Sequence, residues 1–412
     1  MTELSIVPAG AGAGKTHHIQ ETLTQWVRDG KVRPERILAV TFTEAAAGEL
    51  RQRIRGALIA DGNLQAALAV ERAYVSTIHG LGRRLLIEHA FAAGSSRQQR
   101  LIAEDEQDLL IRRSIEENQA LSELSRNLGA YGYRGSFTSD DTPEDSFRKT
   151  LLGVIALLRT LGPRGGDPAM ADFVEASIRQ GYRQPVGTPE ALAAGLKEAV
   201  DALLVAFPRS LADDAGSAAA KTAFRDNFRA LKQAEQLLST GGKDWKLWQR
   251  LRDLRQSKRG SPTPDGYDDL AAAVMAAADT LVFHPGPLED AVSHARALVE
   301  GAQSAMSDYE TRKRELGVID FSDMVTNAAR ILDDKPGVLA AIMDEVDCVI
   351  VDEFQDTNPI QFTFLWALAR QAKRSLVVGD TKQAIMGFQG ADPRLTVALT
   401  KQFETRRRGQ IG

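Results

Sequence analysis

Cysteine is almost absent from this chain, which has one, Cys348, among 412 residues. A single cysteine excludes a disulfide within the chain and makes a cysteine-rich zinc or iron–sulfur site implausible. Because Cys348 begins the apolar run Cys348-Val349-Ile350-Val351, we expect it to be a buried, unreactive thiol.

Long apolar runs are also missing: no eighteen consecutive residues are apolar, so the sequence predicts no membrane span. No leader peptide is expected either, since the first strand is predicted at residues 4–7. With 43% hydrophobic residues the chain can build more than one core. We expect a cytoplasmic protein of two or three domains.

The chain has no excess of positive charge. Its formal net charge of −4 gives no general attraction for nucleic acid, so DNA binding would need a local basic surface. The candidates for such a surface are five arginines: Arg51, Arg53, Arg55, Arg83 and Arg84. Arginines on ordinary solvated helix faces would account for this pattern equally well.

A loop of small residues follows the first predicted strand. Its sequence, AGAGAGKT, lets backbone N–H groups converge on phosphate oxygens. Lys15 would then reach the β- and γ-phosphates, and the Thr16 hydroxyl would ligate Mg²⁺. The strict pattern starts with glycine where this chain has alanine, and a flexible loop is the alternative. The predicted phosphate site comprises Ala9, Gly10, Ala11, Gly12, Ala13, Gly14, Lys15 and Thr16.

A second apolar strand, in VIVDEFQDTN, ends in two carboxylates. Asp352 would hold Mg²⁺ through water, and Glu353 would polarise the attacking water. An acidic pair at a strand end is usually a solvated turn, but the phosphate loop upstream favours nucleotide hydrolysis. The sequence therefore predicts ATP and Mg²⁺ as cofactors.

Four further segments, taken with the phosphate loop, resemble the successive motifs of the UvrD/RecB-type superfamily 1 DNA helicases. They are VTFTEAAAGELRQRI, STIHGLGRRLL, DEFQDTNPIQ and VGDTKQAIMGFQGAD. GVIDFSDM also resembles the helix that precedes the family's acidic motif. The resemblance implies an ATP-dependent helicase that moves 3′ to 5′ on single-stranded DNA, in DNA repair or recombination.

The same resemblance implies roles for individual residues. Gln383 would sense the γ-phosphate, Gln355 would couple the acidic motif to its neighbours, and Asp380 would close that network. DNA contacts are implied for Thr41, Phe42, Thr43, Thr77, His79 and Phe388, with Phe388 stacking on a base. Core packing is the alternative for the two phenylalanines, and a structural role is the alternative for the histidine.

The chain departs from the family pattern in four places. Gln389 stands where many members have arginine, and Met386 stands where tyrosine is common. No adenine-reading motif precedes the phosphate loop. After Asp392 the sequence does not continue into the second RecA-like lobe, whose arginines would complete the ATP site. We therefore expect single-stranded DNA as a partner, together with a second helicase lobe or a nuclease subunit on another chain.

The expected fold is α/β: a RecA-like P-loop NTPase domain with a parallel sheet, interrupted by a large, mostly α-helical insertion. The domain would occupy residues 1–90 and 316–400, the RecB/AddA-like insertion 91–315, and a basic tail 401–412. In the insertion, Trp245 and Trp248 are expected to pack in the core rather than touch DNA or a partner.

Two alternative functions remain open. One is a non-catalytic nucleotide- and DNA-binding subunit of a helicase–nuclease or defence complex. The other is a phosphoryl-transfer enzyme of a different P-loop class, against which the DEFQD and GDTKQ segments argue.

Overall fold

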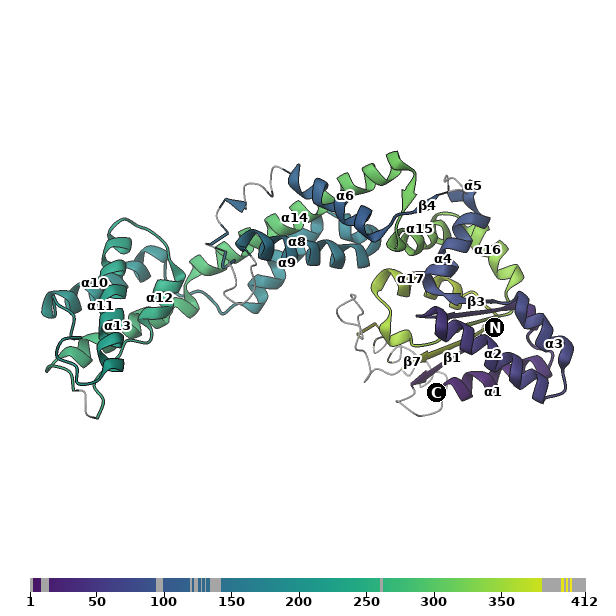
Figure 1. Cartoon of the computed structure of the whole chain (residues 1–412), viewed down its shortest axis with the longest axis horizontal. Coiled ribbons are helices and arrows are strands. Elements are labelled where there is room, and N and C mark those ends of the chain that lie inside the picture. The colour runs from purple at the N-terminus through teal and green to yellow at the C-terminus, as the bar shows by residue number, and fades with distance from the viewer. Residues whose placement is uncertain are drawn as a thin grey trace, which may run out of the picture. The chain divides into compact units, whose positions relative to one another are not determined.

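The computed structural model describes residues 3–8, 15–93, 99–118, 142–259 and 262–379, with short stretches at 121, 125–126, 128–129, 131–133, 394–395, 398 and 401. The chain divides into two compact units (Figure 1). The first unit comprises Met1–Gln119, Lys149–Asp167 and Gly301–Gly412. The second comprises Ala120–Arg148 and Pro168–Glu300, which lie within the expected insertion.

A five-stranded sheet forms the centre of the first unit. Its strands are β1 (Glu3–Pro8), β2 (Ile37–Thr41), β3 (Tyr74–Thr77), β6 (Cys348–Val351) and β7 (Arg374–Gly379). Their order is β1-β7-β6-β2-β3, and every pairing is parallel. β2 and β6 are buried at every position, which explains their uninterrupted apolar sequences. The expected α/β fold with a parallel sheet is confirmed.

Helices cover both faces of this sheet because its side chains alternate between two cores. Val349 and Val351 of β6 lie in one core, and Cys348 and Ile350 lie in the other. The first core packs α4 (Ile78–Glu88), α15 (Phe321–Asp334), α16 (Pro336–Glu345) and α17 (Pro359–Ala369). The second packs α1 (Lys15–Arg28), α2 (Glu44–Ala60) and α3 (Leu64–Ala69). Cys348 is fully buried, and burial raises the pKa of its thiol, as its apolar context predicted.

Smaller elements complete the first unit. A two-stranded parallel sheet pairs β4 (Arg100–Leu101) with β5 (Val318–Ile319). The helices α5 (Ala90–Ala93) and α6 (Glu104–Glu116) follow α4 along the chain. Single 3₁₀ turns lie at Pro34–Arg36, Val70–Arg72, Gly162–Gly166 and Phe354–Asp356.

The second unit is helical and has its own core. It contains α9 (Ala169–Gly181), α10 (Pro189–Ala206), α11 (Ala218–Ser239), α12 (Trp245–Leu251) and α13 (Tyr267–Asp279), followed by a 3₁₀ turn at Thr280–Phe283. The division between the units falls within α8 (Pro143–Thr160) and α14 (Pro285–Leu316). Trp248 is 2% exposed and packs in the core of α10 to α13, as predicted, while Trp245 is half-buried beside it. No helix in the described part of the chain is long and apolar enough to cross a membrane.

Candidate nucleotide and DNA site

The carboxyl ends of the five parallel strands lie along one edge of the sheet. Pro8 pairs with Gly379 at the ends of β1 and β7, and Thr41 pairs with Thr77 at the ends of β2 and β3. β6 lies between these two pairs of strands and ends at Val351. Open parallel sheets bind their ligands outside this edge. The predicted site residues that the structure describes therefore follow neighbouring strand ends, although they come from distant parts of the sequence.

The predicted nucleotide side of this edge begins at β1. This strand leads toward the predicted phosphate loop, and α1 begins at Lys15, so Lys15 and Thr16 have the strand–loop–helix context that such loops require. The side chains of Lys15 and Thr16 lie outside the described residues. So do the remaining residues of the predicted loop, which are Ala9, Gly10, Ala11, Gly12, Ala13 and Gly14. Asp380, Gln383 and Phe388 also lie outside the described residues.

The acidic segment forms a tight turn directly after β6. The backbone N–H of Asp352 donates to the carbonyl of Val40, and the N–H of Glu353 donates to Asp352 Oδ1 at 2.9 Å. Glu353 has φ 53°, and among the described residues it is the one non-glycine with positive φ. Backbone strain of this kind, about 1–3 kcal/mol, is concentrated at functional sites. The turn presents both carboxylates at the edge where the sheet should bind its ligand.

Gln355 connects this turn to the neighbouring strand. Gln355 is 2% exposed, and its Nε2 donates to Glu353 Oε2 at 2.7 Å and to Asp356 Oδ2 at 3.1 Å. The last residue of β7, Gly379, passes so close that a Cβ there would lie 2.9 Å from Gln355 Oε1. Any side chain at position 379 would displace the amide. Gln355 therefore contacts both Glu353 and the end of β7.

Two of the three threonines expected to meet DNA cap the helices that follow the neighbouring strands β2 and β3. Thr43 caps α2, accepting from the Ala46 N–H at 3.1 Å, and Thr77 caps α4, accepting from the Gly80 N–H at 3.0 Å. The Thr77 hydroxyl also donates to Glu44 Oε1 at 3.0 Å, which links the two helix starts. The ends of β2 and β3 are thereby held together as one surface.

The other expected DNA residues differ in burial. Thr41 is 1% exposed, and its hydroxyl donates to the Thr43 carbonyl at 3.1 Å. It therefore stabilises the turn between β2 and α2 from its buried side. Phe42 is partly buried against the first core. His79 lies in the first turn of α4, and burial lowers the pKa of its imidazole, which favours the neutral ring at physiological pH.

Comparison with known proteins agrees with this geometry. The family model described as "UvrD/REP helicase N-terminal domain" matches residues 1–404. The chain belongs to this family.

Relatives of this UvrD/REP domain include proteins whose names describe them as ATP-dependent helicase/nuclease subunits. The relative from Syntrophomonas wolfei is 27% identical over 97% of this chain and 34% of its own length. Those from Pelotomaculum thermopropionicum and Geobacillus thermodenitrificans are 28% and 26% identical, again over 97% of this chain and over 34% and 35% of their own lengths. This chain thus spans about a third of the relatives that it matches.

The structure of the UvrD/REP domain adds one exposed aromatic residue that was not among the site residues predicted from the sequence. Phe321, the first residue of α15, is 52% exposed, and its ring lies edge-on to His79 with centroids 5.8 Å apart. A large apolar side chain this exposed beside a predicted DNA contact is a candidate stacking surface. Its segment, GVIDFSDM, had indicated only a helix, and the exposure of one ring cannot be read from a motif.

A buried ionic cluster fixes the beginning of α15. Asp320 and Asp323 form a capping box, and Lys313 Nζ lies 2.7 Å from both oxygens of Asp323 and 3.1 Å from Asp320 Oδ2. Tyr309 donates to Asp320 at 2.9 Å, and Arg159 pairs with the same carboxylate. Burial opposes ionisation of Asp320, but Arg159 and Lys313 outweigh it and hold its pKa at about 2. The cluster holds the helix end that carries Phe321.

Four of the five arginines considered for a basic surface have partners within the first unit, and the fifth, Arg83, is exposed. Arg51 donates to the Val75 carbonyl at 2.6 Å, Arg53 pairs with Glu49, and Arg55 pairs with Glu71 at 3.2 Å. Arg84 pairs with Glu88 at 2.7 Å and lies 3.5 Å from the Tyr74 ring centroid. These pairings favour the alternative of ordinary solvated helix faces.

The residues at the sheet edge suit a Mg²⁺–nucleotide ligand. Among the described residues no group of three or more His, Cys, Asp or Glu side chains could hold a metal ion. Magnesium in nucleotide sites needs no such cage, because one or two carboxylates combine with phosphate oxygens and water. Asp352, at the end of β6, is the described carboxylate that fits this role.

Proposed function

We propose that this chain couples ATP hydrolysis to movement on single-stranded DNA, as the motor domain of an ATP-dependent 3′–5′ DNA helicase of the UvrD type. The observation that carries the proposal is the strand order. The acidic strand β6 lies between β1 and β7, which belong to the nucleotide side, and β2 and β3, which carry the expected DNA contacts. A change at the nucleotide would reach the DNA side through one strand.

In the nucleotide half, Lys15, Thr16 and Asp352 would hold Mg·ATP. When bound, Mg·ATP supplies the phosphoryl group that is transferred to water. Glu353 would orient that water and accept its proton, a role that needs a carboxylate at a fixed position. The strained turn supports this assignment, because its αL backbone sets the direction of the Glu353 side chain.

Coupling between the halves would pass through Gln355. Its amide contacts Glu353 and approaches the end of β7, which leads to Asp380 and Gln383. Gln383 would report the γ-phosphate, and Phe388 would carry that signal to a base. We expect substitution of Gln355 to reduce the stimulation of hydrolysis by DNA more than hydrolysis without DNA.

In the DNA half, Thr41, Phe42, Thr43, Thr77 and His79 would line the path of the strand. Phe321 extends this path, because its exposed ring lies against His79. Stacking on an aromatic face tolerates any base, which suits a protein that must pass every sequence. A neutral His79 can donate or accept a hydrogen bond without adding charge.

The names of the relatives suggest the wider assembly. Those proteins are called helicase/nuclease subunits, and this chain spans about a third of them. We therefore propose that its partners are a second RecA-like lobe or a nuclease subunit. Repair or recombination of DNA in the cytoplasm would be the setting. The alternative is a non-catalytic nucleotide- and DNA-binding subunit of a helicase–nuclease or defence complex.

The test is ATP hydrolysis by this chain with and without single-stranded DNA, alone and with the partner lobe. Hydrolysis should be stimulated by DNA and lost in Lys15→Ala and Glu353→Gln, with Glu353→Gln retaining nucleotide binding. Glu345→Gln is the matched control, because Glu345 is an exposed carboxylate just before the opposite end of β6. Unchanged nucleotide affinity in Lys15→Ala would contradict the site. Tight binding without turnover, even with the partner lobe, would favour the non-catalytic alternative.

A further inference from the structure

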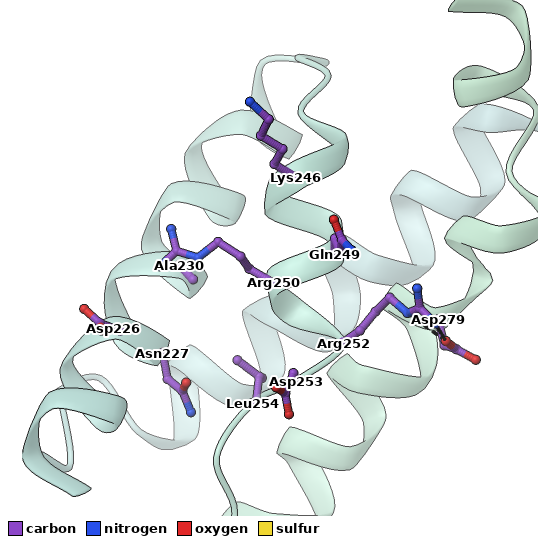
Figure 2. Close-up of a pocket in the computed structure, with 10 residues that line it drawn as sticks. All are labelled: Asp226, Asn227, Ala230, Lys246, Gln249, Arg250, Arg252, Asp253, Leu254 and Asp279. Atoms are coloured by element: carbon purple, nitrogen blue, oxygen red, sulfur yellow. Dashed lines mark hydrogen bonds and ion pairs between the residues drawn. The ribbon is translucent and has the colours of Figure 1, made fainter. Parts of the chain in front are cut away.

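A hollow of about 820 Å³ in the second unit lies beside α12 (Figure 2). Its lining contains three carboxylates and three cations, which are Asp226, Asp253, Asp279, Lys246, Arg250 and Arg252. Figure 2 shows Arg252 beside Asp279, with which it forms an ion pair. Because these charges balance and none of the six residues is buried, the hollow favours no charged ligand. The charged groups that converge at the end of α8 in the first unit are different, because they are buried.

The end of α8 is held by a buried contact with the start of α15. Arg159, in the last turn of α8, pairs with Asp320, which caps α15. The Arg159 side chain is 14% exposed and the Asp320 side chain 1% exposed. Tyr309 Oη and Lys313 Nζ of α14 lie 2.9 and 3.1 Å from the same Asp320 oxygen. Arg159 therefore brings a cation from α8 to a carboxylate whose other partners come from α14.

The turn directly after α8 rests on a second helix, α17. It begins at Gly162, which has φ 60°, and a Cβ on this residue would lie 2.6 Å from Ile360 Cδ1 of α17. Glycine suits this position because it tolerates positive φ and needs no space for a side chain. Gln303 of α14 holds the turn, since its Nε2 donates to the carbonyls of Gly165 at 2.9 Å and Asp167 at 2.8 Å. The end of α8 thus contacts α15, and the turn that follows it contacts α17.

These two helices lie on different sides of the proposed site. α15 begins with Phe321, whose ring lies against His79 on the DNA side. α17 begins at Pro359, and a capping box at Asn358 joins it to the acidic segment on the nucleotide side. A displacement of either helix would therefore reach the end of α8.

We propose that Arg159 and Gly162 are positioning residues that couple the nucleotide site to the DNA path through the end of α8. This coupling rests on the proposed function, although both residues lie outside the segments that resemble the family's motifs. When nucleotide binding shifts the acidic turn, α17 would move against Gly162, and Arg159 would carry the displacement to Asp320 and hence to Phe321. Close-packed protein interiors transmit such displacements because they are hardly compressible.

The first test measures the affinity of the full chain for labelled oligothymidine with and without Mg²⁺ and a non-hydrolysable ATP analogue. Coupled ligands typically change each other's affinity about 5–150-fold, and we expect a change of this size in the unaltered protein. Arg159→Gln should bring the ratio of the two affinities to within about twofold of one, and Arg159→Lys should keep part of the change, because it retains the charge. The matched control is Arg164→Gln, which removes the same charge from an exposed residue of the following turn. A merely structural loss would lower both affinities alike and leave their ratio unchanged.

The contact with α17 is tested in the same assay by Gly162→Ala. Its Cβ would push against Ile360 Cδ1, so the ratio of affinities should fall toward one. Gly162→Ala/Ile360→Val lacks that Cδ1 atom and should recover part of the ratio. Gly166→Ala, in the same turn, is the control, because a Cβ there meets nothing within 4 Å.

The second test needs no variant that could fail to fold. Hydrogen exchange followed by mass spectrometry compares the full chain with and without the same ATP analogue. Exchange should change together in peptides that cover the acidic turn at 352–358, the end of α8 at 157–163 and the start of α15 at 319–325. Peptides from α12, beside the hollow in Figure 2, should not change.

The coupling is overturned if Arg159→Gln and Arg164→Gln give the same ratio, or if the ratio in the unaltered protein is already close to one. Exchange that changes at the acidic turn but not in α8 and α15 would also overturn it. A chain that shows the coupling but hydrolyses no ATP, even with its partner lobe, would contradict the proposed function alone. DNA-stimulated hydrolysis that is unaffected in Arg159→Gln would contradict this coupling alone.

Discussion

Replacing Lys313 by methionine should destabilise the first unit severely, although Lys313 belongs to none of the motifs recognised in the sequence. The Lys313 side chain is 2% exposed, and its Nζ lies 2.7 Å from Asp323 and 3.1 Å from Asp320. Methionine fills nearly the same volume but removes the cation that pairs with Asp323, and it leaves Asp320 with Arg159. Removing one partner of a buried pair costs about 3–5 kcal/mol, a large part of a domain's usual 5–15 kcal/mol.

The assay is urea denaturation followed by circular dichroism and fluorescence, since the two units can unfold separately. Lys335→Met, at an exposed lysine beside α16, is the control and should change the free energy of unfolding by less than about 0.5 kcal/mol. Adding Asp323→Asn to Lys313→Met should recover part of the loss, because Asp323 pairs with Lys313 and the amide carries no charge, while Asp320 keeps Arg159 as its partner. A loss below about 1 kcal/mol in Lys313→Met would refute the electrostatic reasoning.

Three further outcomes are expected. Gly82→Ala should destabilise the first unit by about 1–3 kcal/mol in thermal unfolding, because the added Cβ would lie 2.5 Å from the Met324 carbonyl oxygen and force α4 and α15 apart. The control Gly48→Ala should not destabilise it, because the added Cβ there meets nothing within 4 Å. Phe321→Ala should weaken binding of single-stranded DNA about tenfold in fluorescence anisotropy with little change in melting temperature, since the ring is half exposed; an unchanged affinity would remove Phe321 from the site. Burial opposes ionisation of Asp347, but hydrogen bonds from Arg33 and Lys373 outweigh it and hold the pKa of this carboxyl at about 2. Because that pKa lies below the unfolded value of 3.8, the ionised Asp347 carboxylate contributes fully to stability above about pH 4, and this contribution is lost between about pH 4 and 2. Asp347→Asn should therefore make the melting temperature fall less steeply as the pH is lowered through this range.

The sheet and its acidic turn could be predicted from local sequence. Apolar runs such as Cys348-Val349-Ile350-Val351 are buried on both faces, and strands of this kind belong to parallel sheets. The two-residue alternation then sends Val349 and Ile350 to different cores. Asp352 and Glu353 follow that strand directly, so their position at the carboxyl edge was fixed once the strand was recognised.

The contacts that complete the site could not be predicted in this way. Lys313 lies in the charged sequence RKREL, which is typical of an exposed helix end, yet it is buried because α15 brings two carboxylates to it. Phe321 was predicted only to belong to a helix, and it is exposed because it begins α15 rather than lying on the buried face of that helix. Both facts depend on how the helices pack against one another, and no local pattern encodes that packing.

The strand order has a consequence for how the chain is made on the ribosome. Among the strands that the structure describes, β1 pairs only with β7, with Glu3 opposite Arg374, and β2 receives its neighbour β6 equally late. At about 5–20 residues per second, β1 would wait roughly 20 to 75 seconds for its partner. During that time its backbone edge and those of β2 and β3 offer unpaired hydrogen-bonding groups to other chains. The second unit ends at Glu300, before β6 and β7, so it can fold meanwhile, and cellular yield should depend on chaperones that shield the waiting strands.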